Sequence, residues 1–545
     1  MRATLGASYD QVVSGAKAAA DAEHVDLGVF AALRTHWKAT LFSMGLSFAL
    51  VMEGYDVVVI NSFYGQSQFI NTFGTVLPNG EKVITAPWQT GLSNSALVGE
   101  VIGLGLNGWA SDRFGYRKTY MVSMAVMMIT VLAPVLARSL PALSAGEVLM
   151  GIPWGVFQTL TTAYASEIAP VMLRPYLTSF VCACWGLGIL LSSIVVKLTL
   201  VIPGEWSWRL PFALQWVWPI PLALIAFFAP ESPWYLVRHQ RFDDARKALK
   251  KLQTKNSGDD QHIEHQVAFM NHTNALEKAE QSGASYFECF KGTSLRRTEI
   301  VAVVWALQWL CGNPLMSYAV TFYRRAGLDE NTAFSLNCIM NTTYLIGTAS
   351  SWFLMRWFGR RTLYLAGCVM CCAHLIAIGT LGFFSGEAVS WATGSLLITF
   401  ALGYNCTIGP VCYTIVAEIP SSRLRAKSIV LSRLTYVLTG LLTNTLTPRM
   451  LSPDAWNWGA KGAFLYLGTC ALCGIWCWFR LPETANRTYA EVDELFARGI
   501  AARKFSTTQV NLYETEKRHA VVRADSLNDD KVLDDKDLRT ATLDA

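Results

Sequence analysis

The sequence predicts an all-α membrane protein in which twelve transmembrane helices form two similar six-helix bundles. Three observations predict this fold: the composition, twelve long apolar windows, and motifs of the first half that recur in the second. Of the 545 residues, 52% are hydrophobic and only 16% are charged, which is too apolar for a soluble protein of this size. The net charge of +5 is spread through the loops, so we expect no nucleic-acid partner.

The 13 cysteines do not change this prediction, because most of them lie inside apolar segments, where cysteine acts as a small hydrophobic side chain. We therefore expect neither a disulfide framework nor a metal site. The first 27 residues are polar and lack a short apolar core followed by a cleavage site. This pattern is not that of a signal peptide, so we expect the first span to insert as itself.

Apolar windows of about 20 residues match the hydrocarbon thickness of a bilayer. Twelve such windows occur, at about residues 40–63, 90–110, 119–137, 145–165, 177–200, 211–229, 300–322, 333–355, 362–383, 393–416, 428–447 and 462–480. An even number of spans places both termini on one side. The loops that follow even-numbered spans are the richer in Lys and Arg, namely Arg113, Arg117, Lys118, Arg174, Arg356, Arg360, Arg361, Arg423, Arg425 and Lys427. This bias predicts that both termini are cytoplasmic.

Three loop motifs of the first half recur about 250 residues later, each after the equivalent span. DRFGYRK (112–118) recurs as RWFGRRT (356–362), SEIAPVMLRPY (166–176) as AEIPSSRLRAK (417–427), and APESPWYLVR (229–238) as LPETANRTYA (481–490). The repeats indicate two halves of one duplicated unit. Parallel six-helix halves with a substrate site between them at mid-depth are a transporter architecture.

The repeats and spans divide the chain into five regions. We predict a cytoplasmic tail (1–37), a six-helix bundle (38–238), a cytoplasmic connector (239–296), a second six-helix bundle (297–482) and a second cytoplasmic tail (483–545). In the connector, the apolar residues of FDDARKALKKL recur at helical spacing and predict a short helix. The ends of the chain, residues 1–37 and about 505–545, are charged and poor in apolar residues, so we expect them to be disordered.

Several of these motifs resemble known families. GWASDRFGYRK resembles the loop motif GxxxDRxGRR of the major facilitator superfamily, and PESPWYLVR resembles the PESPRWL motif of its sugar-porter branch. Over about residues 38–504 the chain looks like the fungal α-glucoside (maltose) permeases, which are proton symporters, in MEGYD, GIPWGVFQTLTTAYASE, GPVCYTIVAEIPSSRLRAKS, LTPRML, AWNWGAKGAF and FRLPETANRTYAEVDELF. The resemblance implies a monomer in the cell membrane that imports an α-glucoside, with a proton as coupling ion and no cofactor.

The stretch LVMEGYDVVVI places two carboxylates, Glu53 and Asp56, on one face of the first span. A charge at mid-membrane costs roughly 2.5 to 3.5 kcal/mol, so it is seldom kept without a role. Four further charged residues lie within spans: Glu100, Glu147, Lys197 and Arg433. For Glu147 and Lys197 we expect positions near span ends, from which the charge reaches the interface.

Glu53, Asp56, Glu100 and Arg433 lie deeper in their spans, and we expect them to face a wet cavity inside the bundle. Because burial favours the protonated form of a carboxyl group, such a cluster can take a proton on one side and release it on the other. In sugar porters the aspartate of the first span pairs with an arginine of the fourth. Here GEVLMG has Glu147 at that position, so Arg433 becomes the candidate counter-ion of Asp56.

A sugar site needs convergent hydrogen-bonding groups and an aromatic face. Seven candidates lie within spans: Gln158, Gln308, Asn313, Tyr318, Asn341, Asn405 and Tyr413. Tyr436, near Arg433, is a further candidate. Gln308 and Tyr318 match the QQxxGxN…Y pattern of the family. The alternative for each is an ordinary hydrogen bond between helices.

The chain departs from its relatives at polar positions of this site. Trp309, Pro314, Ile189, Met340 and Leu434 stand where polar residues are usual. A site built for hydroxyl groups discriminates by factors near 10⁴ when such pairing is lost. The cargo is therefore expected to be less hydroxylated than maltose, such as a glycoside with an apolar aglycone or another metabolite.

Loop charges that recur in both halves resemble the cytoplasmic network that closes sugar porters on the inside. They are Asp112, Arg113, Arg117, Glu167, Arg174 and Glu231 in the first half, and Arg360, Arg361, Glu418, Arg425 and Glu483 in the second. Exposed pairs are each worth about 0 to 1 kcal/mol, but a network can bias a two-state equilibrium. The alternative is that these charges only fix the topology.

Three other functions compete with import. An exporter of a small metabolite fits the reduced polarity of the site, but the fifth span lacks a GxxxGPxxGG-like stretch. A nutrient sensor usually has a long tail, whereas about 40 residues follow Phe505. An enzyme is disfavoured, because no nucleotide loop, metal-binding spacing or soluble catalytic domain is present.

Overall fold

The structure is a computed structural model. It describes residues 33–34, 36–78, 80–168, 173–252, 260–281, 286–325, 327–384, 386–421, 424–485, 487 and 489–508. Most of the two tails expected to be disordered lies outside these residues.

The first half contains six helical spans, several of which are broken into shorter helices. They are α3 (Trp37–Ser47) with α4 (Ala49–Phe63), α6 (Ala86–Phe114), α7 (Tyr116–Thr130) with α8 (Leu132–Leu136), α9 (Leu140–Ile168), α10 (Arg174–Thr199), and α11 (Trp206–Ala213) with η1 (Leu214–Val217) and α12 (Pro219–Phe228). The last break precedes Pro219, which has no N–H group to continue the helical hydrogen bonds.

The second half repeats this arrangement. Its spans are α16 (Gly292–Leu310) with α17 (Asn313–Ser317) and α18 (Ala319–Arg325), α19 (Glu330–Phe358), α20 (Arg360–Leu381), α21 (Glu387–Cys406) with α22 (Ile408–Glu418), α23 (Arg425–Leu451), and α24 (Ala463–Arg480). The twelve predicted spans are thus confirmed.

Nine of the spans in the described residues are long and apolar enough to cross a membrane by length and composition alone. The other three are α6, α16 and α19. Polar residues, small residues or charges interrupt the apolar sequence of each of these helices. All three contribute side chains to the cavity described below, which explains their lower hydropathy.

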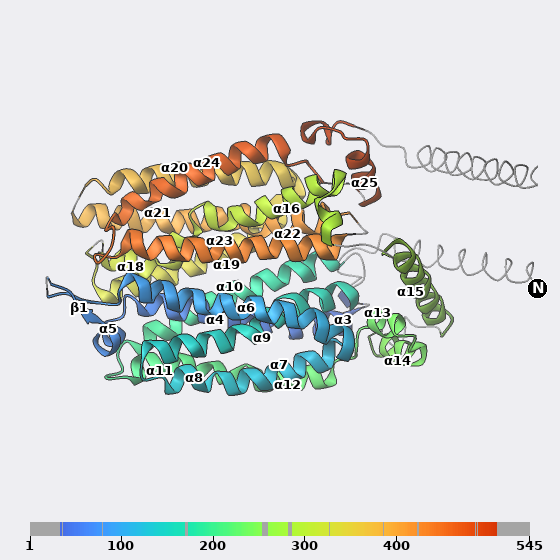
Figure 1. Cartoon of the computed structure of the whole chain (residues 1–545), viewed down its shortest axis with the longest axis horizontal. Coiled ribbons are helices and arrows are strands. Elements are labelled where there is room, and N and C mark those ends of the chain that lie inside the picture. Colours follow the sequence, from blue (N-terminus) through green and yellow to red (C-terminus); the bar gives the residue numbers. More distant parts are fainter. Residues whose placement is uncertain are drawn as a thin grey trace, which may run out of the picture.

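Figure 1 shows the two halves side by side, with the long helices running along the longest axis. One end, called here the hairpin end, carries α5 (Ser67–Phe73) and the antiparallel strands β1 (Thr75–Val76) and β2 (Lys82–Val83). The opposite end, called the connector end, carries α13 (Pro233–Arg238), α14 (Phe242–Leu252), α15 (Asp260–Gln281) and α25 (Tyr489–Ala497). Helix α14 is the short helix that the sequence predicts in the connector. Short 3₁₀ turns complete the described elements: η2 (Tyr286–Phe290), η3 (Gly459–Gly462) and η4 (Ala502–Lys504).

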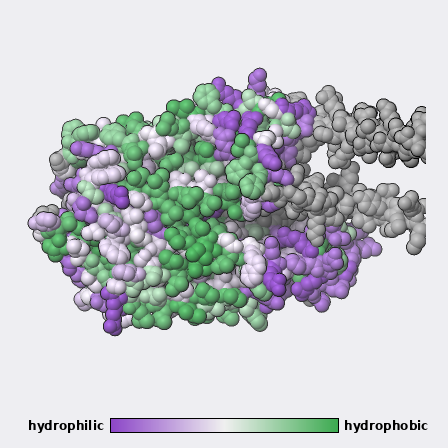
Figure 2. Space-filling view, viewed as in Figure 1, coloured by the Kyte–Doolittle hydropathy of each residue, from purple (hydrophilic) through white to green (hydrophobic). Residues whose placement is uncertain are grey.

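The surface between the two ends is apolar. Figure 2 shows a hydrophobic band flanked by polar residues at both ends. Leu198, Val369 and Leu472 are examples of large apolar side chains that are about 70% exposed (67%, 71% and 70%). An apolar belt with polar caps is the surface that a lipid bilayer covers.

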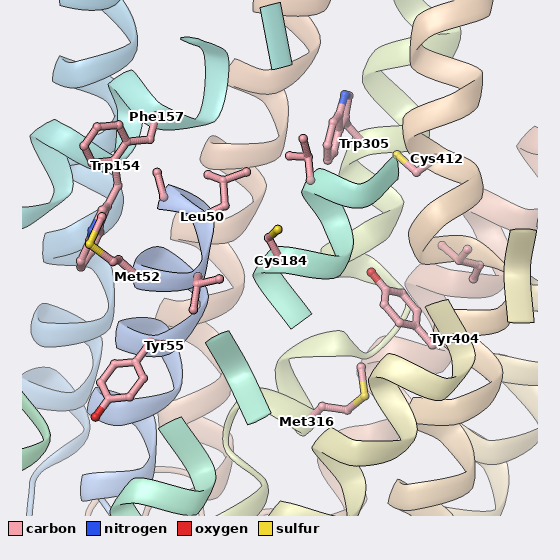
Figure 3. Packing of buried hydrophobic residues seen from close by; sticks show 14 of the residues in the cluster. Leu50, Met52, Tyr55, Trp154, Phe157, Cys184, Trp305, Met316, Tyr404 and Cys412 are labelled. Atoms are coloured by element: carbon pink, nitrogen blue, oxygen red, sulfur yellow. The ribbon is translucent and has the colours of Figure 1, made fainter. Parts of the chain in front are cut away.

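Inside each half, buried side chains fill the space between helices. Leu50 and Met52 of α4 lie near Trp154 and Phe157 of α9, whereas Trp305 belongs to the second half (Figure 3). Two glycines of α9 bring it against α6: a Cβ at Gly155 would lie 2.2 Å from the carbonyl oxygen of Glu100. A Cβ at Gly151 would lie equally close (2.2 Å) to a carbonyl oxygen of α6. These glycines therefore serve close helix packing.

Candidate functional site

A central cavity lies between the two halves and encloses about 1100 Å³ of empty space, open solvent included. Its walls come from both halves: α4, α6, α9 and α10 face α16, α17, α19, α21 and α23 across it. A smaller cavity adjoins it, with about 420 Å³ of empty space, open solvent again included. The two share the lining residues Glu53, Trp185, Asn313, Tyr344, Arg433 and Tyr436. They are therefore treated as two compartments of one chamber.

An ion pair joins the halves in this chamber. Arg433 of α23 donates to an oxygen of Glu100 on α6 at 2.9 Å, and both residues are buried. The guanidinium group also lies over the rings of Tyr436 (4.3 Å) and Trp305 (5.1 Å). Rings and carboxylate together replace the water that a buried guanidinium group loses.

Glu53 is the second carboxyl group of this cluster. Gln158 of α9 donates to one of its oxygens at 2.6 Å, and Glu53 lines both compartments. The charges of Glu100 and Arg433 act on it. Two carboxyl groups and one guanidinium group leave an unbalanced negative charge unless one carboxyl is protonated. The arrangement can therefore hold a proton within reach of the chamber.

The predicted pairing of Asp56 with Arg433 is wrong in this structure. Asp56 accepts a hydrogen bond from Gln215 of η1 in the sixth span, and it lies against Glu147 of α9. Asp56 still lines the larger compartment, as does Arg433, but the partner of Arg433 is Glu100. The sequence shows how deep a charged residue lies in its span, but it does not show which neighbouring helix its side chain faces.

The expected position of Glu147 is also wrong. It lies two turns inside α9 and is 0% exposed, so it does not reach the interface. Lys197, in contrast, occupies the last turn of α10 and is partly exposed, as predicted.

Five of the seven predicted sugar-binding residues line the chamber, as does Tyr436, the further candidate. Gln158, Gln308 and Tyr413 line the smaller compartment, Asn341 the larger, and Asn313 both. The amide of Gln308 is already engaged. It donates to the carbonyl oxygens of Ile408 (3.2 Å) and Gly409 (3.3 Å) and accepts from Tyr404. The Asn313 side chain has no hydrogen bond to a described residue and lines both compartments, so Asn313 is the better placed of the two for a ligand.

The other two predicted residues line neither compartment. Tyr318 is fully buried, donates to Ser93 of α6 at 2.9 Å and stacks on Tyr64 of the first half. Asn405 is also fully buried and donates to the carbonyl oxygen of Ala401 at 2.8 Å. Tyr318 thus bridges the halves, and Asn405 bonds within its own helix.

Aromatic residues that the sequence reasoning missed form much of the wall. Trp305 contacts Tyr413 and Tyr436 with ring centroids 4.9 and 5.1 Å apart, and Trp309 contacts Tyr436 at 5.3 Å. Within the described residues, the indole N–H groups of Trp154, Trp305 and Trp309 have no hydrogen-bond partner. Other missed lining residues are Asn61, Trp185, Asn337, Tyr344, Tyr404 and Asn444. Tryptophan in the middle of a span, away from the interfaces where it is usual, was the available signal.

Three of the five departures from the family pattern line the larger compartment. Ile189, Trp309 and Met340 line the larger one, beside Val57, Val58, Ile60, Ala96, Leu97, Met316 and Ala401. Leu434 lines neither compartment and is 39% exposed, and Pro314 is buried outside both. The larger compartment therefore has a wall that is mainly apolar by area, with Asn337, Asn341 and Asn444 among its polar residues, while Gln158 and Gln308 line only the smaller one.

Hydrogen bonds close the hairpin end. Glu330, at the start of α19, accepts from the backbone N–H (2.9 Å) and the hydroxyl (2.6 Å) of Ser67. Asp454 accepts from the backbone N–H of Ala86 at 2.9 Å. Deeper bonds also join the halves: Asn94 with Thr445, Ser93 with Tyr318, and Ser193 with Asn337 and Asn341.

At the connector end, the repeated loop motifs build the same contact in each half. Glu231 accepts from the backbone N–H of Tyr116 (2.9 Å), and Glu483 accepts from that of Arg360 (2.8 Å). The motif glycines make this possible, since both have positive φ: a Cβ at Gly115 would lie 2.5 Å from an oxygen of Glu231. Burial raises the pKa of the Glu231 carboxyl group.

The other predicted gate residues also bond within one half. Glu167 pairs with Arg238 at 2.6 Å, and Glu418 pairs with Arg360 at 3.1 Å. The guanidinium groups of Arg117 and Arg361 donate to carbonyl oxygens of their own halves. Asp112 and Arg113 are exposed, and the side chains of Arg174 and Arg425 lie outside the described residues.

Among the predicted gate charges whose side chains the structure describes, none closes the connector end across the halves in this conformation. In the part of the chain that the structure describes, the hydrogen bonds and ion pairs between the halves lie at the hairpin end and around the chamber. The repeated charges of the connector end instead brace each half internally.

Comparison with known proteins decides the family. The model of the family described as "Sugar (and other) transporter" matches residues 43–496. The chain belongs to this sugar transporter family. The match covers both halves and every residue that forms the chamber walls.

Curated relatives of this sugar transporter are permeases of Saccharomyces cerevisiae. The "General alpha-glucoside permease" is 37% identical over 532 residues, with 96% of this chain and 85% of the relative covered. "Maltose permease MAL31" is 36% identical over 540 residues, with 98% and 87% covered. Relatives named as permeases place this chain among transporters rather than enzymes.

Solved structures support the fold. The proton:xylose symporter XylE, bound to 6-bromo-6-deoxy-D-glucose, has a TM-score of 0.68 and 20% identity, with 85% of this chain and 99% of that chain covered. A partially occluded, inward-open form of XylE from E. coli has a TM-score of 0.67 and 19% identity, with 84% and 100% covered. This sugar transporter therefore has the major facilitator superfamily fold.

Proposed function

We propose that this sugar transporter imports an α-glucoside together with protons, by alternating access across a cell membrane. The relatives named α-glucoside and maltose permease support the cargo class. The observation that carries the coupling is the Glu100–Arg433 ion pair, which joins the two halves in the chamber beside Glu53.

The ion pair gives protons a way to act on the conformation. Glu53 lies in the same half as Glu100 and is the second carboxyl group that Arg433 acts on. A proton that joins or leaves this pair of carboxyl groups changes the negative charge that faces Arg433, and with it the attraction between the halves. Because the ion pair spans the halves, proton occupancy biases the equilibrium between the two open states.

We take the connector end and both termini to be cytoplasmic, because the loops rich in Lys and Arg favour this orientation. The hairpin end, which carries the hydrogen bonds between the halves, then faces outward. In this assignment the structure is the form whose outer end is closed. The outward-open form, in which the repeated charges of the connector end exchange partners across the halves, is the other state of the cycle.

The two compartments suggest how the cargo lies. In this proposal the glucosyl ring lies at the smaller one, where Gln158 and Asn313 line the wall beside the rings of Trp305 and Tyr436. The apolar wall of the larger compartment suits an apolar aglycone. We therefore place glucosides such as p-nitrophenyl α-glucoside in the cargo class, beside maltose.

The test is uptake in yeast cells that lack glucoside transporters. Radiolabelled maltose and p-nitrophenyl α-glucoside are offered at two external pH values, with Asp56→Asn and Glu100→Gln as variants. We expect both variants to lose acid-driven accumulation while Glu100→Gln still exchanges cargo in counterflow. Unchanged pH-dependent accumulation in Asp56→Asn and Glu100→Gln would refute the proposed coupling.

The apolar compartment also favours a second function, export of a less hydroxylated metabolite. Counterflow in sealed vesicles, with the proton gradient imposed first in one direction and then in the other, separates the two. Import predicts accumulation only when the side of the hairpin end is acidic.

A further inference from the structure

Asp56 and Glu147 form a pair of buried carboxyl groups that is separate from the Arg433 cluster. Asp56 lies on α4 and Glu147 on α9, both side chains are 0% exposed, and the two groups interact directly. Two ionised carboxylates in contact repel strongly, and away from water nothing screens them.

The surroundings do not supply a compensating cation. Gln215 donates to one oxygen of Asp56. Apart from each other, the second oxygen of Asp56 and both oxygens of Glu147 have no hydrogen-bond partner among the described residues. No lysine, arginine or histidine of the described chain contributes to the electrostatics of either group.

The titratable groups next to the carboxyl pair are the phenol groups of two tyrosines, which donate their hydroxyl protons to other acceptors. Tyr55 and Tyr64 interact with the pair, but Tyr55 donates to the carbonyl oxygen of Pro211 at 2.9 Å. Tyr64 donates to that of Gln89 at 3.1 Å. A proton held between the two carboxyl groups is therefore the remaining way to balance the pair.

We propose that Asp56 and Glu147 form a second proton site, in which the two carboxyl groups share one proton. This inference rests on the proposed proton coupling. It adds Glu147 as a positioning residue that acts through Asp56.

The geometry divides the roles of the pair. Asp56 lines the larger compartment and can exchange its proton with water there, whereas Glu147 lies behind it and lines neither compartment. Glu147 opposes ionisation of Asp56 because an adjacent carboxylate would have the same charge. Glutamine at this position removes that opposition, and its amide can donate to an ionised Asp56.

The test is the pH profile of initial uptake of p-nitrophenyl α-glucoside, or of maltose where it is carried faster, by Glu147→Gln. We expect half-maximal uptake to move to a more acidic pH by about one unit, the effect typical of losing a like charge in contact. Thr161→Val is the matched control. Thr161 lies on the same helix, is 1% exposed and donates to the carbonyl oxygen of Phe157 at 2.7 Å, away from the pair.

The outcomes separate this proposal from the previous one. A wild-type profile without pH dependence overturns the proposed coupling and this site with it. A normal wild-type profile that Glu147→Gln reproduces overturns the shared proton alone, as does an equal shift in Thr161→Val.

A direct measurement covers the case in which Glu147→Gln fails to fold. Infrared spectroscopy of the purified protein at neutral pH detects a protonated carboxyl group through its C=O stretch. We expect a band in the wild type that is lost or displaced in Asp56→Asn. A spectrum in which Asp56→Asn leaves the band unchanged would overturn the proposal.

Discussion

Arg433 of α23 and Glu100 of α6 meet at 2.9 Å across the central chamber, although 333 residues separate them in the chain. Among the described residues this is the one salt bridge between the two halves. Both side chains are nearly inaccessible, at 10% and 6% exposure. A buried charge is tolerated only while its partner is present. We therefore expect the pair to affect the stability of the protein as well as the proposed proton coupling.

Removing only one member of the pair should destabilise the protein strongly. Arg433→Met leaves Glu100 buried without its partner, and loss of one member of a buried pair costs about 3 to 5 kcal/mol. We expect the double variant Arg433→Met/Glu100→Leu to recover most of this loss, since no uncompensated charge remains. Thermal unfolding of purified protein measures both.

An exposed pair gives the control for this comparison. Arg241 and Asp244 pair at 2.8 Å on the connector end, with side chains 57% and 41% exposed. Arg241→Ala should change the unfolding temperature little, because exposed pairs contribute about 0 to 1 kcal/mol. A double variant no more stable than Arg433→Met would contradict the prediction.

The sequence was sufficient for the spans, the repeat and the set of charges, because hydropathy and motif spacing are local properties. It was not sufficient for the pairing of those charges. Glu53 and Asp56 share a helix face three residues apart, yet one joins the Arg433 cluster and the other meets Glu147. Which partner each receives depends on the rotation and packing of α9 against α4, and only the folded arrangement sets these.

The aromatic wall shows a similar limit. Trp185 and Trp305 lie within apolar spans, where a tryptophan facing lipid and one facing a cavity have the same sequence context. Both line the chamber because they lie on the inward-facing side of their helices. Polar residues within spans are easier to recognise as candidates, yet Tyr318 and Asn405 are engaged in hydrogen bonds outside the chamber wall.

Close packing of α6 and α9 predicts a steric effect at Gly155. A Cβ there would lie 2.2 Å from the carbonyl oxygen of Glu100, so Gly155→Val must push the helices apart. We expect a loss of about 1 to 3 kcal/mol or more, the range for overpacking, and a lower unfolding temperature.

Gly105, on α6, is the matched control for Gly155. A Cβ at Gly105 meets nothing within 4 Å, and replacement of glycine by alanine inside a helix favours the helix by about 1 kcal/mol. Gly105→Ala should therefore be neutral or stabilising. Equal unfolding temperatures for Gly155→Val and Gly105→Ala would show that the helices are not in contact there.

The hydrogen bonds of Glu330 predict a shift in conformation. Glu330→Ala removes both bonds to Ser67 at the hairpin end, and about 1.4 kcal/mol of lost stabilisation raises the population of the opened form about tenfold. We expect a cysteine placed at Ser317, which lines the larger compartment, to react about tenfold faster with an impermeant maleimide added to intact cells.

Two controls accompany this labelling experiment. Glu387 is exposed in the first turn of α21 at the same end and has no hydrogen bond to a described residue of the first half, so Glu387→Ala should leave the rate unchanged. The protein without the Ser317→Cys change corrects for native cysteines such as Cys182, which lines the smaller compartment. A rate in Glu330→Ala equal to that in Glu387→Ala would contradict the role of Glu330.

The apolar wall of the larger compartment predicts a change in cargo preference. Ile189 and Met340 line it at positions where the family resemblance leads us to expect polar residues, and Leu434 is a departure of the same kind outside it. Ile189→Gln and Met340→Asn should shift the uptake ratio of maltose to p-nitrophenyl α-glucoside toward maltose by about tenfold or more, since apolar contacts are lost and hydroxyl partners gained.

Leu434→Asn adds an amide on the partly exposed side of α23, so it should leave the ratio near the wild-type value. Competition uptake of the two glucosides at one pH measures the ratio directly. If Leu434→Asn changed the ratio as much as Ile189→Gln does, the preference would reflect a general effect on the fold rather than contact with the aglycone.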